Sequence, residues 1–290
     1  MAHSYLALNP CFKRIEKWIQ NPIKRISLGL EPSGKIHLGH YVAINQIIRL
    51  KLLYPDLEVL IYIADYHARM NKKKNIQEYT RKTVEFFSLI LPYAIIRVGS
   101  KENFNSPLYW SLLTQLLGKM TVNSVLRTFP YQRKLGLKDS LEDLKSMNMD
   151  LFLYGPAQIV DPHYLQTELV IAGIDQVNIY NAIYDYYPHF NWDAPTLVYT
   201  PLLNGNLQEV SLENIDKKQS ASKTSVALDV MLYDTVVKSL DGGKTFFDYI
   251  EEKNLQKYYF VDSKTEFLTN LKTNLWAIKD KNFTFNIDTF

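Results

Sequence analysis

The sequence has 290 residues and a formal net charge of +3, with 47% hydrophobic and 22% charged residues. These proportions are ordinary for a globular protein and exclude the disordered and fibrous classes. No run of about 18 apolar residues occurs, so we expect no membrane-spanning helix and no membrane partner. The single cysteine predicts no internal disulfide, and the first residues lack the pattern of a secretory signal. We therefore expect a cytoplasmic location.

The first hundred residues alternate between strand-like and helix-like patterns. We predict short buried strands at 26–30, 59–64 and 94–98, with helices at 38–53 and 76–91 between them. The second strand is an unbroken apolar run, which is typical of a parallel sheet covered on both faces. This alternation predicts the α/β class, with a doubly wound (Rossmann-like) parallel sheet.

The alternation stops at about residue 103. Residues 103–150 are helical in pattern and carry Lys119, Arg127, Arg133, Lys134 and Lys138. We predict that this segment is a helical insertion between the two halves of the sheet. A large domain over 1–222, insertion included, and a small, mainly helical C-terminal domain over 223–290 are expected. After the insertion we predict a helix near 165–173, a strand near 176–179, a helix through 186, a strand at 196–198, a long polar loop at 204–225 and helices from 228 onward.

The segment His37-Leu-Gly39-His40 follows a predicted strand and opens a predicted helix. Backbone N–H groups and the helix dipole favour an anion at such a place. Two imidazoles three residues apart on the first turn can face one ligand, and Gly39 allows a flat ring to approach the backbone. The pattern predicts a site for a nucleoside triphosphate. The alternative is a pair of histidines that cap and pack the helix.

A second polar segment, Lys218-Gln-Ser-Ala-Ser222, lies in the long loop. A lysine ammonium on such a loop can bind the β- and γ-phosphates and stabilise leaving pyrophosphate. Ser220 and Ser222 add hydroxyl donors, and Lys223 adds a charge. Taken alone, the segment is more typical of an ordinary solvated loop, because lysine and serine are common there. Its pairing with the histidine segment makes the phosphate interpretation specific.

The third segment carries Tyr154, Gln158 and Asp161, which share one face if the segment is helical. A phenol, an amide and a carboxylate that converge on one pocket can bind the side chain and ammonium of an amino acid. Asp175 follows Gly173 and can accept from ribose hydroxyls. The alternative is a helix-capping aspartate before Pro162 together with ordinary polar surface.

These segments together resemble the tyrosyl-tRNA synthetases of the archaeal and eukaryotic type, which are class I aminoacyl-tRNA synthetases. The resemblance runs from about residue 26 to residue 229. It rests on Gly29-Leu-Glu-Pro-Ser-Gly-Lys-Ile-His-Leu-Gly-His40, Ala64-Asp-Tyr-His67-Ala68, the Tyr154/Gln158/Asp161 spacing, Gly173-Ile-Asp-Gln176 and the Lys218 loop.

The resemblance implies ATP-dependent activation of L-tyrosine as tyrosyl-adenylate, with Mg²⁺ on the phosphates, and transfer to tRNA(Tyr). It implies a homodimer built through the insertion, and no metal ligands on the protein itself. Asp161 would accept the hydrogen bond of the substrate phenol. The catalytic residues that it implies are His37, His40, Lys218, Ser220 and Ser222; the ATP-binding residues are Gly29, Glu31, Pro32, Gly39, Gly173, Asp175 and Lys223; the amino-acid-binding residues are Ser27, Ala64, His67, Tyr154, Gln158, Asp161 and Gln176.

Three departures from the family pattern keep other functions open. Ser27 stands where the family commonly has a tyrosine that meets the substrate phenol, and Gln219 replaces a methionine of the lysine loop. The 68 residues after Ser222 are fewer than the usual anticodon-reading domain. One alternative is a tryptophanyl-type or other amino-acid-specific synthetase, since tryptophanyl enzymes often carry an alanine where Ala221 lies. The other is a catalytically silent paralogue that binds RNA.

Overall fold

A five-stranded sheet in which all neighbouring strands are parallel forms the centre of the computed structural model. The model describes residues 24–34, 36, 40, 43–44, 46–47, 50–51, 54–129, 148–200, 202–203 and 209–210. The strands are β1 (Arg25–Leu30), β2 (Glu58–Ile63), β3 (Ile95–Val98), β4 (Leu169–Gly173) and β5 (Thr196–Thr200), and their order in the sheet is β3-β2-β1-β4-β5.

The order of the strands reverses at β1, which pairs with β2 on one edge and with β4 on the other. From β1 the chain runs outward to β2 and β3, and it then returns to place β4 and β5 on the other side. Ile26 pairs with Val59 of β2 on one side and with Leu169 of β4 on the other. This is the doubly wound arrangement that the sequence predicts, and the prediction is confirmed.

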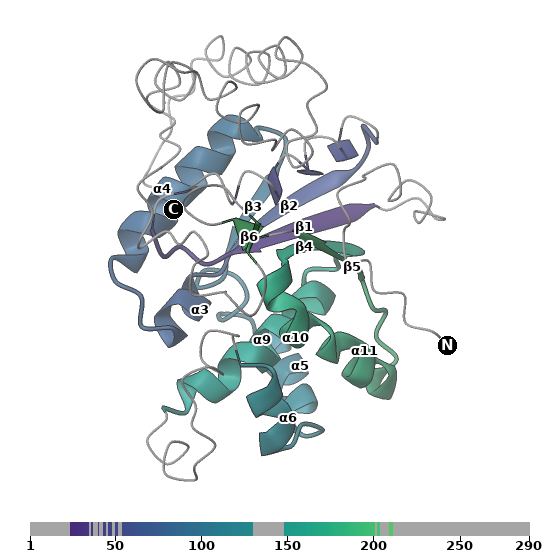
Figure 1. Cartoon of the computed structure of the whole chain (residues 1–290). Helices are drawn as coiled ribbons and strands as arrows, with labels where there is room; N and C mark the ends of the chain where they lie inside the picture. Colours follow the sequence, from purple (N-terminus) through teal and green to yellow (C-terminus); the bar gives the residue numbers. More distant parts are fainter. Residues whose placement is uncertain are drawn as a thin grey trace.

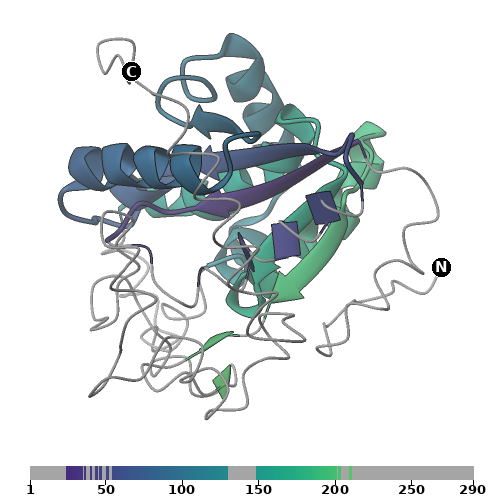
Figure 2. The same cartoon turned by 90° about the horizontal axis from the view of Figure 1, so that it is seen from above.

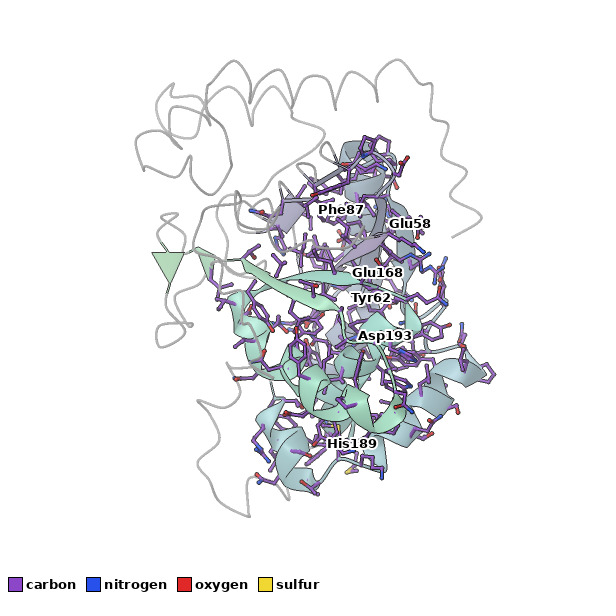
Figure 3. The ribbon with its side chains drawn as sticks, turned by 90° about the vertical axis from the view of Figure 1, so that its right-hand side faces the viewer. Glu58, Tyr62, Phe87, Glu168, His189 and Asp193 are labelled. Carbon is purple, nitrogen blue, oxygen red and sulfur yellow. The ribbon has the colours of Figure 1, made fainter. Side chains whose placement is uncertain are left out.

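Helices cover both faces of the sheet (Figures 1 and 2). The helix α4 (Ile76–Ile90) packs on β2 and β3, and Phe87 of this helix lies on the opposite side of the sheet from His189 (Figure 3). The other face carries α5 (Pro107–Leu117), α6 (Val122–Arg127), α9 (Asp150–Tyr164), α10 (Val177–Tyr180) and α11 (Ala182–Tyr186). The shorter elements are α3 (Asp65–Met70), η2 (Ile174–Gln176), η3 (Tyr187–Phe190) and the small hairpin of β6 (Leu202–Leu203) and β7 (Glu209–Val210).

Most predicted elements of the first half are confirmed. The strands and the helix at 76–91 agree with the structure within one residue, and the residues described between 40 and 51 are helical. The described part of the insertion is helical, as α5 and α6. The helices predicted from residue 228 and most of the polar loop at 204–225 lie outside the described residues.

Two predicted elements are wrong. The segment 165–173 is not a helix, because α9 ends at Tyr164 and Leu169–Gly173 forms strand β4. Gln166 adopts a left-handed backbone (φ 54°), which breaks the helix before the strand begins. The segment 176–179 is not a strand, since it passes from η2 into α10. Its alternating Val177 and Ile179 suggested a strand, whereas Ile179 is buried in the helical layer beside α9.

The helix α9 contains two prolines, Pro156 and Pro162, which cannot donate backbone hydrogen bonds. The Tyr187 hydroxyl compensates beside Pro162. It donates to the carbonyl of Ile159 (2.7 Å) and accepts from the N–H of His163 (3.2 Å), so it bridges one turn of the helix. This bridge supports the part of α9 that carries Asp161.

Gly155 brings α9 into close contact with the end of α6. An added Cβ atom would lie 2.0 Å from Oγ1 of Thr128 and 2.6 Å from its Cβ, far inside contact distance. Thr128 is buried, and its hydroxyl donates to the carbonyl of Val125 (2.7 Å), so it cannot move aside freely. The glycine is therefore required by packing.

We predict that Gly155→Ala destabilises the protein by about 1–3 kcal/mol, although alanine is the better helix former, because overpacking outweighs propensity. The measurement is the urea concentration at the midpoint of unfolding. Gly118→Ala is the matched control, since Gly118 has helical backbone angles and an added Cβ would meet nothing nearer than 3.4 Å. Equal midpoints for the two variants would contradict the packing argument.

Candidate functional site

The predicted site residues that the structure describes gather at the carboxyl ends of β1, β2 and β4. In open α/β sheets, ligands bind in the crevice outside the carboxyl ends where the strand order reverses. Glu31 follows β1, Ala64 follows β2, and Gly173 ends β4. The helix α9 lies beside these strand ends and carries Tyr154, Gln158 and Asp161 on one face, as predicted.

Glu31 connects three elements at this edge. Its Oε2 accepts from the hydroxyl of Tyr154 (3.1 Å) and from Nδ2 of Asn71 (2.8 Å), and its Oε1 lies 3.9 Å from Nζ of Lys73. The bond from Tyr154 uses the only hydrogen of that hydroxyl and leaves its oxygen lone pairs available. Burial is the main cause that raises the pKa of Tyr154, and Glu31 raises it further, so the phenol stays neutral.

His67 lies between Tyr154 and Asp161. Its ring packs edge-on against that of Tyr154, with centroids 5.0 Å apart, and its Nε2 lies 3.8 Å from Oδ2 of Asp161. Burial lowers the pKa of His67 to about 4, and the backbone of Tyr154 opposes this only in part. Neither ring nitrogen makes a hydrogen bond of normal geometry to the described residues. His67 is therefore a neutral imidazole at physiological pH.

Asp161 is a buried carboxyl group, with 5% of the residue exposed. Its Oδ1 accepts from the hydroxyl of Tyr109 (2.8 Å) and from Nδ2 of Asn103 (3.1 Å). Burial raises its pKa to about 7, and these two hydrogen bonds oppose the shift. The alternative that Asp161 caps a helix is wrong, because it lies inside α9 near the C-terminal end.

The amides of Gln158 and Gln176 join α9 to the segment after β4. Nε2 of Gln158 donates to Oε1 of Gln176 at 3.1 Å. Gln158 also bonds the hydroxyl of Tyr180, whose pKa burial raises. Tyr180 faces β1, since a Cβ added to Gly29 would meet its hydroxyl at 3.9 Å. The two amides and this phenol thus form one polar cluster beside β1.

Gly173 and Asp175 lie at the carboxyl end of β4. Asp175 is buried, and its Oδ1 would lie 2.5 Å from a Cβ added to Gly173. A larger residue at position 173 would displace the carboxylate. Gly173 ends strand β4 instead of the helix predicted at 165–173, and Asp175 follows it in η2.

The remaining described site residues are backbone neighbours of this cluster. Ser27 is buried in β1 and shares its side of the sheet with Gly29, because side chains alternate along a strand. Pro32 is buried beside Glu31. Ala64 donates its N–H to the carbonyl of Leu30 (2.8 Å), which ties the ends of β1 and β2 together.

The predicted triphosphate residues fall largely outside the described part of the chain. His40 lies in the helix that follows β1 and is half-buried. His37, Gly39, Lys218, Ser220, Ser222 and Lys223 lie outside the described residues, so the approach of the Lys218 loop to His40 stays a prediction.

Sequence reasoning missed four residues of the cluster. Tyr109 and Asn103 bind Asp161, Asn71 binds Glu31, and Tyr180 binds Gln158. Tyr109 and Asn103 belong to the insertion, which the sequence suggested only as an interface, and no local motif singles them out. Asn71 and Tyr180 follow recognised segments by a few residues, so a search of those neighbourhoods for polar groups would have found them.

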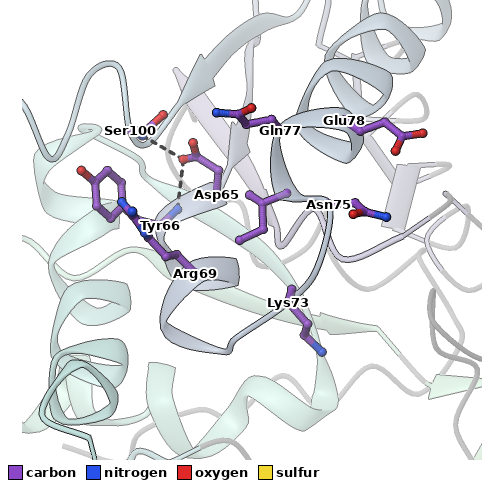
Figure 4. Close-up of a pocket in the computed structure, with 9 residues that line it drawn as sticks. Asp65, Tyr66, Arg69, Lys73, Asn75, Gln77, Glu78 and Ser100 are labelled. Atoms are coloured by element: carbon purple, nitrogen blue, oxygen red, sulfur yellow. Dashed lines mark hydrogen bonds between the residues drawn. The ribbon is translucent and has the colours of Figure 1, made fainter.

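A polar pocket of about 630 Å³ adjoins the cluster, at the carboxyl ends of β2 and β3 (Figure 4). Asp65 anchors its wall by accepting from the N–H groups of Tyr66 (3.0 Å) and Ser100 (2.8 Å). Arg69 and Lys73 supply positive charge, and Lys73 also approaches Glu31. Among the described residues, no group of three or more His, Cys, Asp or Glu side chains is placed to hold a metal, and no helix is long and apolar enough to cross a membrane.

A family model described as class I tRNA synthetases (W and Y) matches residues 20–244, which is more than half of the chain. The chain belongs to this family. Among curated proteins of the family, the tyrosine–tRNA ligase of Methanoculleus marisnigri is 30% identical over 192 residues, which is 64% of this chain and 57% of that protein. The tyrosine–tRNA ligase of Methanospirillum hungatei is 28% identical over 200 residues, which is 67% of this chain and 59% of that protein. The chain thus spans less than two thirds of the length of these relatives.

Solved structures of the same family share the fold. The tyrosyl-tRNA synthetase of Archaeoglobus fulgidus, complexed with L-tyrosine, matches with a TM-score of 0.58 at 20% identity, covering 91% of this chain and 93% of that chain. A tryptophanyl-tRNA synthetase of Encephalitozoon cuniculi bound to tryptophan matches with a TM-score of 0.60 at 16% identity, covering 91% and 82%. At these identities the likeness establishes the fold alone.

The shifted pKa values of Asp161 and His67 predict opposite effects of pH on stability. Asp161 has its pKa raised from 3.8 to about 7, so between these values the folded state holds more protons, and stability falls as pH rises. His67 has its pKa lowered from 6.5 to about 4, so between these values stability rises with pH. In the wild type the two contributions largely cancel.

Removing one of the two groups should leave the contribution of the other to the pH dependence of stability uncancelled. Relative to wild type, we expect the unfolding free energy of Asp161→Asn to increase from pH 4 to 7 and that of His67→Gln to decrease from pH 4 to 6.5. Urea unfolding at half-unit pH intervals measures both differences. Differences of the same sign for the two variants would contradict the burial of both groups in their neutral forms.

Proposed function

We propose that the protein activates L-tyrosine with ATP as tyrosyl-adenylate and transfers the tyrosyl group to tRNA(Tyr), releasing AMP and pyrophosphate. One observation carries the choice of tyrosine: a buried carboxyl group, Asp161, whose Oδ1 is filled by two donors and whose Oδ2 accepts no hydrogen bond from the described residues. A substrate phenol supplies the missing donor. Phenylalanine, which lacks the hydroxyl, leaves this buried oxygen unpaired, and that penalty gives strong discrimination.

The other end of the amino acid faces the polar groups of α9 and η2. The Tyr154 oxygen has lone pairs available because its hydrogen is donated to Glu31, and it accepts from the substrate ammonium. Gln158 and Gln176 orient the ammonium and backbone, while Asp175 accepts from the ribose. Ser27, Ala64 and His67 complete the walls of the amino-acid site.

The nucleotide half of the proposal rests on the sequence motifs. His37 and His40 bind ATP where the helix after β1 begins, and Gly29, Glu31, Pro32, Gly39 and Gly173 shape the backbone around the nucleotide. Lys218, Ser220, Ser222 and Lys223 stabilise the departing pyrophosphate. Mg²⁺ would be held by the phosphate oxygens of the nucleotide, which are ligands it prefers, and would lower the repulsion between these phosphates and the attacking carboxylate.

The proposal extends to assembly and location. We propose a homodimer formed through the insertion, whose helices carry the exposed residues Leu108 of α5 (61%) and Val122 of α6 (62%). The working unit is a catalytic domain over 1–222 with a C-terminal domain over 223–290 that contacts tRNA. Since the proposed activity supplies charged tRNA for translation, we also propose a cytoplasmic location.

Lys218→Ala should lower tyrosine-dependent ATP–pyrophosphate exchange by about 100-fold, because the ammonium stabilises charge that develops only in the transition state. Lys217→Ala, which removes the neighbouring charge, is the matched control and should retain exchange. The wild type is assayed with a panel of amino acids. Exchange with tryptophan instead of tyrosine would indicate the tryptophanyl activity, and RNA binding without any exchange would indicate a silent paralogue.

Asp161→Asn should raise the KM for tyrosine by about 10- to 100-fold, because a charge-assisted hydrogen bond to the phenol is lost. The much weaker activity with phenylalanine should not fall. The ratio of kcat/KM for tyrosine to kcat/KM for phenylalanine should therefore decrease. Asp185→Asn, which alters an exposed carboxylate, serves as the control. An unchanged ratio in Asp161→Asn would remove Asp161 from the specificity site.

A further inference from the structure

The geometry points to Tyr109 and Asn103 as positioning residues that set the specificity of the site by holding Asp161 in one orientation. The inference rests on the proposed function, in which Asp161 accepts from the substrate phenol, and it assigns roles to two residues of the insertion. They direct Oδ2 of Asp161 toward the substrate by occupying its Oδ1.

Both donors bind the same carboxylate oxygen. The Tyr109 hydroxyl lies 2.8 Å from Oδ1 and Nδ2 of Asn103 lies 3.1 Å from it, and both residues are fully buried. A carboxylate oxygen has two lone pairs in its plane, so these two donors fill Oδ1 and fix the plane of the group. A third donor, such as a phenol, therefore binds at Oδ2.

The environment of Oδ2 leaves it available for that donor. The polar atom beside it is Nε2 of His67, at 3.8 Å, which is beyond hydrogen-bond distance. Burial keeps His67 neutral, so His67 does not form a competing ion pair with the carboxylate. The neutral imidazole therefore borders the acceptor without using it.

The Tyr109 hydroxyl has one hydrogen and two acceptors within reach. The second is the carbonyl of Ala157, at 3.2 Å. An ionised Asp161 takes the hydrogen because a charge-assisted bond is stronger, and a neutral Asp161 allows the hydroxyl to turn to Ala157. Tyr109 thus stabilises the ionised form, the form in which Oδ2 accepts from a phenol.

Few groups near Asp161 change charge over the pH range of an exchange assay. The phenols that feel its charge are Tyr62 of β2, Tyr109 of α5, Tyr180 of α10 and Tyr187 of η3, and burial raises the pKa of each. His67 of α3 has a pKa of about 4 and is already neutral. Between pH 6 and 8.5, the titration of this cluster is therefore that of Asp161, whose pKa is about 7.

The test is the KM for tyrosine in ATP–pyrophosphate exchange, measured from pH 6 to 8.5 for wild type, Tyr109→Phe and Asn103→Leu. In wild type we expect the KM to fall as pH rises, with a midpoint near 7. Losing a hydrogen bond to the ionised carboxylate should move the midpoint up by about one pH unit in each variant. At pH 7 the KM should rise several-fold while kcat changes little, because binding energy is lost rather than transition-state stabilisation.

Tyr187→Phe is the matched control. It also removes a buried phenol hydroxyl that bonds α9, but that hydroxyl binds the backbone at Ile159 and His163 instead of Asp161. We expect it to lower the thermal unfolding midpoint without moving the pH midpoint of the KM. Should Tyr109→Phe fail to fold, Asn103→Leu decides the question with the same measurement.

The outcomes separate this inference from the proposed function. Wild-type protein without tyrosine-dependent exchange would overturn the proposed function, and the inference with it. Exchange in wild type with an unmoved pH midpoint in the folded Tyr109 and Asn103 variants would overturn the inference alone. An equal shift in Tyr187→Phe would also overturn it, since the effect would then belong to the stability of α9.

Discussion

Strand β1 is held between β2 and β4 by parallel pairing on both of its edges, and the arrangement of the whole site depends on this position. Because the chain leaves β1 in one direction and later returns on its other side, two crossovers diverge above its carboxyl end. Glu31 stands where they part and bonds both Tyr154 of α9 and Asn71 beyond α3. A shift of β1 by one residue would turn Ser27 and Gly29 to the other face of the sheet, away from Tyr180.

At the carboxyl ends of β1, β2 and β4 the protein buries several polar groups, and each of them needs a hydrogen-bond partner. Asp161 obtains two donors from the insertion, Tyr154 obtains Glu31, and Gln158 obtains Gln176. Among the described residues, both ring nitrogens of His67, Oε1 of Glu31 and Oδ1 of Asn103 are buried without a hydrogen-bond partner. Unpartnered buried polar atoms are costly, so their persistence at one place in the fold is typical of a binding site rather than of a core.

The fold of the first half was predictable because its signals are local. Val59–Ala64 is a continuous apolar run, and residues 76–91 repeat apolar residues at the helical period, so each pattern identifies its element. The segment 165–173 was misread because Leu165, Leu169 and Ile171 fit a short helical pattern as well as a strand, and only the backbone break at Gln166 decides between them. Short apolar runs carry this ambiguity in any sequence.

The candidate site was predictable where its residues share one element. Tyr154, Gln158 and Asp161 lie on a single helix, so their spacing alone places them together. Tyr109 and Asn103 lie more than fifty residues before Asp161, and only the packing of α5 against α9 brings them into contact. Contacts between residues so far apart produce no local pattern in the sequence, so the sequence alone could not predict them.

The pairing of Tyr109 with Asp161 also has a consequence for how α5 and α9 are registered against each other. Leu113 and Leu116 of α5 pack with the apolar residues of α9, and these contacts contain no polar group that needs a partner. A shift of α5 by one helical turn, about 5.4 Å, would move the Tyr109 hydroxyl out of hydrogen-bond reach. It would leave the Asp161 carboxylate without this donor in an apolar interface. The hydrogen bond therefore favours one alignment of the two helices. The apolar contacts around it contribute stability but contribute less to the specificity of that alignment.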